Sequence, residues 1–299
     1  MLKDYIQLLR PHQYAKNFFI FLPLFFSLKF HNKYLLANTI FAFFTYCLAA
    51  SSIYIFNDYY DIEEDKKHPT KKNRPLVSGK IPKASAIHLM LILLVYSLII
   101  AYFISIKIFL LILFYISLNI WYTIRLRHVP VIDVFSISIG FIIRLFVGSE
   151  ASDVSVSLWI VIMTFLLALF LAFAKRRDDI LLFLKDKTKT RKVISKYNLE
   201  FVNISMTLMA AVIIVAYTMY SITPEVIEKI KSEYLYLTVI WVTLGILRYL
   251  QITFVYEESG APTRILLKDR FLQLILFCWI ATFWILIYGW DVLVYLFSL

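Results

Sequence analysis

The sequence predicts an all-α membrane protein, a polytopic transmembrane bundle of about nine helices with its N-terminus in the cytoplasm. Hydrophobic residues make up 61% of the 299 residues, and the mean hydropathy is +0.76, which is too apolar for a soluble domain of this length. The apolar residues form long segments separated by short charged ones, as membrane spans require. We expect a single transmembrane domain over residues 1–299.

Nine apolar segments are long enough to be considered as spans. The first contains Pro23 and is shorter than the others, and the third and fourth are separated only by Ser105-Ile106-Lys107, which predicts a tight hairpin. The expected spans are 17–29, 35–57, 84–105, 107–124, 131–149, 157–175, 204–223, 234–255 and 271–290.

The distribution of positive charge predicts the orientation of these spans. With the N-terminus in the cytoplasm, 24 of the 31 Lys and Arg residues fall on the cytoplasmic side and five fall in the opposite loops. The formal net charge of +11 therefore follows the loops, so we expect no nucleic-acid partner. The two long cytoplasmic loops, 57–83 and 175–203, are where we expect an active site.

An aspartate-rich motif ends the second span. Asn57, Asp58, Asp61 and Asp65 are spaced about one helical turn apart, so a continuing helix would stack them on one face. Oxygen ligands of this kind suit Mg²⁺, which commonly binds through a few carboxylates together with substrate phosphates. We predict Mg²⁺ at Asp58, Asp61 and Asp65, beside a bound diphosphate.

Basic residues accompany this motif, and each has a structural alternative. Lys71 and Arg74 follow the aspartates and would neutralise a diphosphate, or they belong to a solvated loop. Lys16 precedes the first span, where snorkelling and positive-inside anchoring are the better explanation from the residues alone. Lys175 and Arg176 end the sixth span, where a stop-transfer cluster is the alternative.

Two further charges lie at or inside later spans. Arg144 falls three turns after Asp133 within the fifth span, and a charge at that depth is a functional hypothesis by default. It would reach an anionic substrate or form a buried structural pair with Asp133 or another carboxylate. Asp269 opens the last helix, where we interpret it as an N-cap.

Together these motifs resemble the UbiA-type intramembrane prenyltransferase superfamily, and within it most closely the decaprenyl-phosphate phosphoribosyltransferases. The likeness extends over nearly the whole chain, and the run after the aspartates is its most specific part. The matching segments are Arg10-Pro11-x-x-Tyr14-x-Lys16-Asn17, Asn57 through Pro75 with His68-Pro69-Thr70-Lys71, Leu126-Arg127-His128, Ile143-Arg144, Ala174-Lys175-Arg176, Ile246-Leu247-Arg248-Tyr249, Gly260-Ala261-Pro262 and Asp269-Arg270.

The resemblance implies a Mg²⁺-dependent transfer of phosphoribose from 5-phosphoribosyl 1-diphosphate to a polyprenyl phosphate, for cell-envelope biosynthesis. Relatives that prenylate aromatic acceptors carry a second aspartate motif after the sixth span, whereas this chain has Lys175 at its first position. That change disfavours a prenyl diphosphate held between two aspartate clusters. The implied catalytic residues are Asp58, Asp61 and Lys16, and the implied substrate-binding residues are Asn17, Asn57, Lys71, Arg74, Tyr122, Arg127, Arg144, Lys175 and Arg176.

Two other functions stay open at this point. An aromatic prenyltransferase would use a polyprenyl diphosphate as donor, and a transporter of an anionic solute would use the intramembrane charges for coupling. Transporters place charges near the midplane, whereas most charges here fall at one edge. We expect the protein in the cytoplasmic membrane of a bacterium or archaeon, with its active site facing the cytoplasm, and a homo-oligomer is left open.

Overall fold

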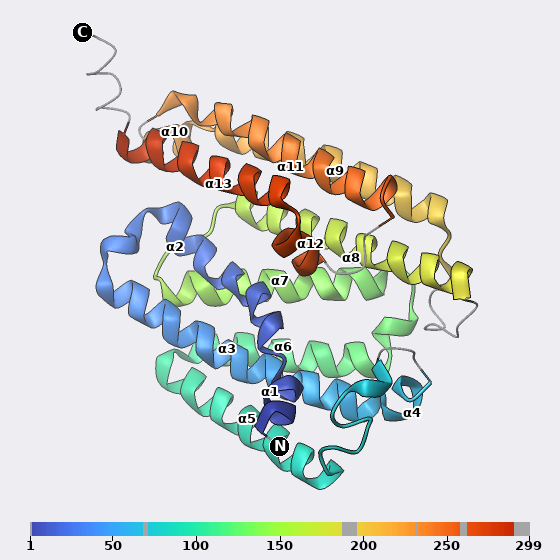
Figure 1. Cartoon of the computed structure of the whole chain (residues 1–299). Coiled ribbons are helices and arrows are strands. Elements are labelled where there is room, and N and C mark those ends of the chain that lie inside the picture. The colour runs from blue at the N-terminus through green and yellow to red at the C-terminus, as the bar shows by residue number, and fades with distance from the viewer. Residues whose placement is uncertain (1, 68–70, 187–195, 231, 258–261, 290–299) are drawn as a thin grey trace. The chain divides into compact units, whose positions relative to one another are not determined.

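The computed structural model describes residues 2–67, 71–186, 196–230, 232–257 and 262–289. Every regular element within them is helical, as the sequence predicts (Figure 1). Eight helices in these ranges are long and apolar enough to cross a membrane: Lys33–Tyr60, Lys83–Ile104, Ile106–Ile124, Ile132–Ala151, Leu158–Leu184, Leu199–Ser221, Glu233–Phe254 and Arg270–Ile287. They correspond to the second through ninth predicted spans.

The first predicted span, 17–29, is not one long helix. A short helix α1 (Leu2–Leu9) is followed by a 3₁₀ segment η1 (Pro11–Phe21), a six-residue helix α2 (Leu22–Ser27) and a 3₁₀ turn η2 (Lys29–His31). Arg10 and Leu28 adopt the left-handed backbone conformation, with φ of 55° and 63°, and these residues interrupt regular helix at both ends. A hydropathy pattern does not record backbone conformation, so it does not show that this segment is divided into 3₁₀ and short helical pieces.

The chain divides into two compact units, residues 1–157 and 158–299. In the first unit the spans are α3 (Lys33–Tyr60), α5 (Lys83–Ile104), α6 (Ile106–Ile124) and α7 (Ile132–Ala151). Small residues on α3, among them Ala42, Ala49 and Ala50, are fully buried in a core shared with η1, α6 and α7. Small side chains let helix backbones approach closely where lipid supplies no hydrophobic driving force.

The tightest of these approaches is between α7 and the N-terminal segment. A Cβ at Gly148 would lie 1.9 Å from the carbonyl oxygen of Ile20, so only glycine fits there. The predicted hairpin is also present, because α5 ends at Ile104 and the side chain of Ser105 caps α6 by accepting from the Lys107 amide at 3.2 Å. These contacts fix η1 against the helices that carry the candidate site.

The second unit contains α8 (Leu158–Asp186), α9 (Leu199–Ser221), α10 (Pro224–Ile230), η6 (Glu233–Thr238), α11 (Val239–Phe254), α12 (Pro262–Lys268), α13 (Arg270–Trp284) and η7 (Ile285–Gly289). The N-cap interpretation of Asp269 is confirmed, because its side chain accepts from the Leu272 amide at 2.8 Å. Arg248 pairs with the same carboxylate at 2.7 Å. A single transmembrane domain over 1–299 stays a prediction.

Candidate functional site

The aspartate motif lies where α3 ends and a single-turn helix α4 (Ile62–Asp65) begins. Asp61 separates them with φ −95° and ψ 8°, but the backbone hydrogen bonds continue across it. The Asp61 amide donates to the Asn57 carbonyl at 3.0 Å, and the Asp65 amide donates to the Asp61 carbonyl at 2.8 Å. The helical spacing predicted for the motif is therefore present, with its four residues distributed over two adjacent rows.

Asp58 and Asp65 form the first row, and the two carboxylates contact the same arginine. Nη1 of Arg74 lies 2.8 Å from Oδ1 of Asp58 and 2.5 Å from Oδ2 of Asp65. Arg10, at the end of α1, donates a second charge-assisted hydrogen bond to Asp58, and Nζ of Lys71 lies 3.7 Å from Asp65. Both carboxylates are almost fully buried, so these cations compensate charges that burial would otherwise penalise.

Asn57 and Asp61 form the second row, and their side chains contact residues at the end of α6 and in the turn that follows it. Thr123 on α6 donates to the Asn57 side-chain oxygen. Nη1 of Arg127 donates to Oδ2 of Asp61 at 2.8 Å and lies 2.7 Å from Oδ1. Arg127 and Asp61 are both buried, so this pair also ties the η4 turn (Leu126–His128) to the end of α3.

A second basic cluster lies beside this motif, on η1 and α7. Lys16 is half-buried and makes no hydrogen bond or ion pair with the residues that the structure describes. Burial, together with the positive charges of Arg144 and Arg10, lowers the pKa of Lys16 from 10.5 to about 8. Arg10 therefore acts on both clusters, since it pairs with Asp58 and also repels Lys16.

Arg144 is buried on α7 and is held by neutral groups. Its Nε donates to Oδ1 of Asn17 at 2.8 Å, and its Nη1 donates to the Gly140 carbonyl at 2.7 Å. Its guanidinium carbon lies 4.8 Å from the ring centre of Tyr46 and 5.1 Å from that of Tyr115. In the described part of the chain no carboxylate pairs with it, so the alternative of a structural pair with Asp133 is wrong.

Asn17 is held by two contacts within the protein. Its amide nitrogen donates to the sulfur of Cys47 at 3.1 Å, and its oxygen accepts from Arg144. Both ends of this buried side chain are thus used within the protein. We interpret Asn17 as the residue that orients Arg144, while direct substrate binding by Asn17 stays a prediction.

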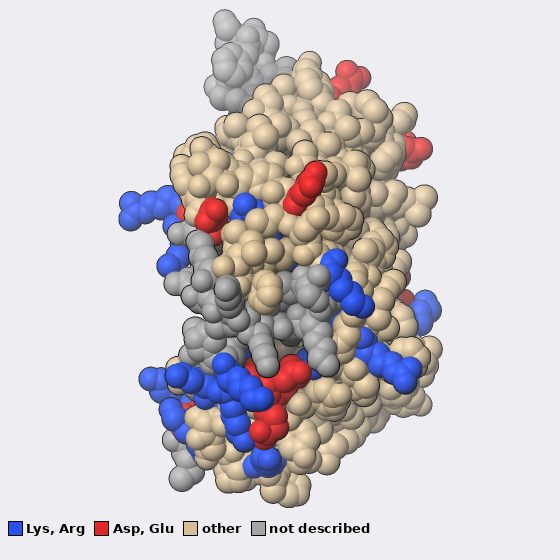
Figure 2. All heavy atoms as spheres, turned by 90° about the vertical axis from the view of Figure 1, so that its right-hand side faces the viewer, with Lys and Arg blue, Asp and Glu red and all other residues tan. Residues whose placement is uncertain are grey.

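The surface around α4 carries charge of both signs. Figure 2 shows acidic side chains in contact with a cluster of basic ones on the lower part of the face that bears α4. The loop after α4 provides several of the exposed cations, including Lys66, Lys67 and Lys72. Of the motif expected there, His68-Pro69-Thr70 lies outside the described residues.

The donor atoms fit a hard divalent cation. A single nitrogen of Arg74 contacts oxygens of both Asp58 and Asp65, so one cation at that position would reach two carboxylates. Oδ1 of Asp61 is buried and lies 2.7 Å from Nη1 of Arg127, but it accepts no hydrogen bond of good geometry from any described residue. No group of three His, Cys, Asp or Glu side chains among those residues converges on one point, which is compatible with Mg²⁺ because it needs only one or two carboxylates when phosphates complete its shell.

Two predicted binding residues lie on α8, in the second unit. Nη1 of Arg176 donates to Asp179 one turn later at 2.7 Å, and Arg176 is almost fully buried, whereas Lys175 is exposed. That these residues bind substrate stays a prediction. Tyr122 is half-buried on α6 beside Thr123, and its role also stays a prediction.

Sequence reasoning missed several residues that the structure brings to the site. Arg10 was part of a matching motif but was given no role, and Thr123, Tyr46 and Tyr115 were not identified. A charge adjacent to Pro11 just before an apolar segment was a usable signal for Arg10. The sequence contains no comparable signal for Tyr46 and Tyr115, because tyrosines are common in membrane spans.

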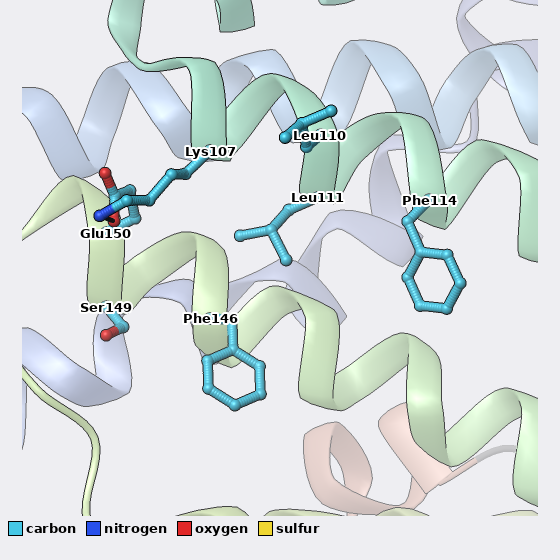
Figure 3. Close-up of a pocket in the computed structure, with 7 residues that line it drawn as sticks. All are labelled: Lys107, Leu110, Leu111, Phe114, Phe146, Ser149 and Glu150. Atoms are coloured by element: carbon cyan, nitrogen blue, oxygen red, sulfur yellow. Dashed lines mark hydrogen bonds and ion pairs between the residues drawn. The ribbon is translucent and has the colours of Figure 1, made fainter.

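One surface groove lies away from this site. It runs between α6 and α7 and is lined by Leu110, Leu111, Phe114 and Phe146, with the ion pair of Lys107 and Glu150 at one end, 3.2 Å apart (Figure 3). Lys107 is in the first turn of α6 and Thr123 is in its last turn. The groove and the aspartate motif therefore lie toward opposite ends of α6, and the groove is not the candidate active site.

Buried carboxylates, guanidinium groups and an ammonium group thus lie together among apolar helices, as expected of an intramembrane enzyme that acts on charged substrates. The UbiA prenyltransferase family model matches residues 18–253, so the chain belongs to the UbiA prenyltransferase family. The expected family is thereby confirmed.

Named relatives and a solved structure agree with this membership. The chain is 31% identical over 293 residues to a decaprenyl-phosphate phosphoribosyltransferase of Mycolicibacterium smegmatis, covering 95% of this chain and 92% of the relative. A protein of the same name from Corynebacterium glutamicum is 28% identical over 279 residues, covering 92% and 84%. A UbiA homologue from Archaeoglobus fulgidus, solved with GPP and Mg²⁺, has a TM-score of 0.72 at 20% identity, covering 95% and 99%; this likeness establishes the fold.

Proposed function

We propose that this protein transfers phosphoribose from 5-phosphoribosyl 1-diphosphate to a polyprenyl phosphate, in a Mg²⁺-dependent reaction that releases diphosphate at the cytoplasmic side of the membrane. The relatives named decaprenyl-phosphate phosphoribosyltransferase support this choice. The observation that carries it is the row of charges from Asp58 through Arg10 to Lys16 and Arg144. It connects the carboxylates to the second basic cluster, which lies beside them on η1 and α7.

These two clusters suit two different anions. The carboxylates of Asp58 and Asp65, with Mg²⁺ bound, favour the diphosphate of a soluble donor, and Arg74 and Lys71 add further positive charge there. Lys16 and Arg144 suit the phosphate of a lipid, because Arg144 lies within the span α7, where a polyprenyl tail has to remain. The two reacting groups would then occupy adjacent positions.

The reaction itself needs little from acid or base catalysis. The bond between C1 of the ribose and the diphosphate oxygen breaks, diphosphate leaves with the electron pair, and a phosphate oxygen of the acceptor forms the new bond to C1. Mg²⁺ supplies positive charge to the departing diphosphate. The acceptor phosphate is already ionised at neutral pH, so no residue has to remove a proton, and Lys16 would act by orienting that phosphate and stabilising its charge.

A direct test uses purified protein in detergent with phosphoribosyl diphosphate, Mg²⁺ and a polyprenyl phosphate. The proposal predicts diphosphate release that requires all three and is lost in Asp61→Asn, which keeps the shape of the side chain but removes its charge. Thermal unfolding of the variant serves as the folding control. If a phenolic acceptor with a prenyl diphosphate reacts and the phosphoribosyl donor does not, the protein is an aromatic prenyltransferase instead.

A further inference from the structure

The arginines of the first row differ from that of the second row in how firmly they are held. The side chains of Arg10 and Arg74 are 19% and 28% exposed, whereas that of Arg127 is 4% exposed. Arg10 connects α1 to η1, and Arg74 follows the short 3₁₀ turn η3 (Lys71–Asn73), so neither lies inside a long helix. Arg127 also lies on a short turn, η4, so the difference between the two rows is one of enclosure: solvent reaches Arg10 and Arg74, whereas Arg127 is almost fully covered.

These arginines contact two of the three carboxylates that are expected to hold the metal ion. Nη1 of Arg74 contacts Asp58 and Asp65 at once, and Arg10 contacts the same Asp58 oxygen. A carboxylate oxygen that faces two guanidinium groups cannot also approach a divalent cation closely, because the like charges repel over a few ångströms. Guanidinium groups, however, bind phosphate as well as they bind carboxylate.

We propose that Arg10 and Arg74 exchange partners when the donor binds: they leave Asp58 and Asp65 to the metal ion and turn to the diphosphate. This inference rests on the proposed function, since it assigns these arginines to the donor rather than to the acceptor. The exchange conserves charge pairing, because each carboxylate gains a cation and each guanidinium gains a phosphate. The metal ion alone should therefore bind weakly, because the displaced arginines would have no new partner. The metal ion together with diphosphate should bind well.

The exchange predicts that removing either arginine strengthens the binding of a metal ion instead of weakening it. Arg74→Gln and Arg10→Gln remove groups that compete with the metal, so each variant should bind Mn²⁺ alone more tightly than the wild-type protein. The gain should be at least about tenfold, the factor that one charge-assisted hydrogen bond of ordinary strength implies. The same variants should bind inorganic diphosphate more weakly, because they lack the guanidinium that would receive it.

The experiment titrates the full-length protein in detergent with Mn²⁺, follows free Mn²⁺ by electron paramagnetic resonance, and measures binding of labelled inorganic diphosphate separately. Arg125→Gln is the matched control, because Arg125 is exposed at the end of α6, pairs with none of the described carboxylates, and its substitution removes the same charge; the Mn²⁺ affinity of this variant should equal that of the wild type. Mn²⁺ binding in Arg74→Gln and Arg10→Gln that is unchanged or weaker overturns the exchange.

Folding and function are separated within the same experiment. Arg10 and Arg74 come from different segments, so either variant decides the question if the other aggregates. If the wild type binds no diphosphate at any Mn²⁺ concentration, the proposed function fails. If it binds diphosphate but the variants show no gain for Mn²⁺ alone, only the exchange fails.

Discussion

Raising the pH from 7 to 9 should lower kcat/KM for the polyprenyl phosphate acceptor by about tenfold, and Lys16 should be the cause. Burial and the nearby charges of Arg144 and Arg10 place the pKa of Lys16 at about 8. Since kcat/KM reports the free enzyme, it should fall as this ammonium loses its proton. The acceptor phosphate is already ionised across this range, so its own charge changes little.

The size of the effect follows from the pKa alone. With a pKa of about 8, about nine-tenths of the lysine is protonated at pH 7 and about one-tenth at pH 9. The charge of Lys16 changes with pH in the opposite sense to that of a carboxylic acid. A lysine is charged below its pKa and neutral above it, whereas a carboxylic acid becomes charged as the pH rises. Anion binding is therefore strong at low pH and is lost as the pH rises through about 8.

Steady-state rates of diphosphate release, measured at limiting acceptor and saturating donor in half-unit steps of pH, test this expectation. Lys16→Arg is the matched variant, because an arginine side chain stays charged throughout the range, and its profile should be flat. Lys16→Gln should be slow and equally flat. If Lys16→Arg retains the tenfold fall, another group titrates and the role given to Lys16 is wrong.

Three further predictions concern stability and use matched controls. Arg127→Leu should lower the free energy of unfolding by about 3–5 kcal/mol, because it leaves Asp61 buried without its cation. Lys107→Leu, at the exposed pair with Glu150, should lower it by at most about 1 kcal/mol. Equal losses in thermal or denaturant unfolding would contradict this difference. Gly148→Ala should cost about 1–3 kcal/mol or more, since its Cβ meets the Ile20 carbonyl at 1.9 Å, whereas Gly245→Ala has only an ordinary contact at 3.6 Å and should stabilise α11 by about 0.5–1 kcal/mol. Asp269→Ala should cost about 1 kcal/mol through loss of the α13 cap, and an unchanged melting temperature would show that the cap contributes little.

Local features of the site could be predicted from the sequence because they depend on helical spacing. Asn57, Asp61 and Asp65 follow one another at four-residue intervals, and the backbone hydrogen bonds continue through them. The positions of eight long apolar helices could be predicted for a similar reason, since a span needs about 20 apolar residues. Each of these features is contained within a short stretch of chain.

The partners of the carboxylates could not be predicted in this way. Arg10 reaches Asp58 across 48 residues, Arg127 reaches Asp61 across 66, and Arg144 reaches Asn17 across 127. No periodic pattern records such long-range pairings, which depend on how the helices pack. Residues 17–29 resembled a span for a similar reason, because hydropathy does not show that they are divided among η1, α2 and η2 with a left-handed residue at Leu28.

Mass spectrometry of the lipid product tests the central claim most directly. After incubation of the protein with phosphoribosyl diphosphate, Mg²⁺ and a polyprenyl phosphate of known length, the account predicts a lipid whose mass has increased by one phosphoribosyl group, with one diphosphate released per lipid formed. The product should be absent with Asp61→Asn. A lipid that remains unchanged while a prenyl group is transferred to an added aromatic acceptor would contradict it.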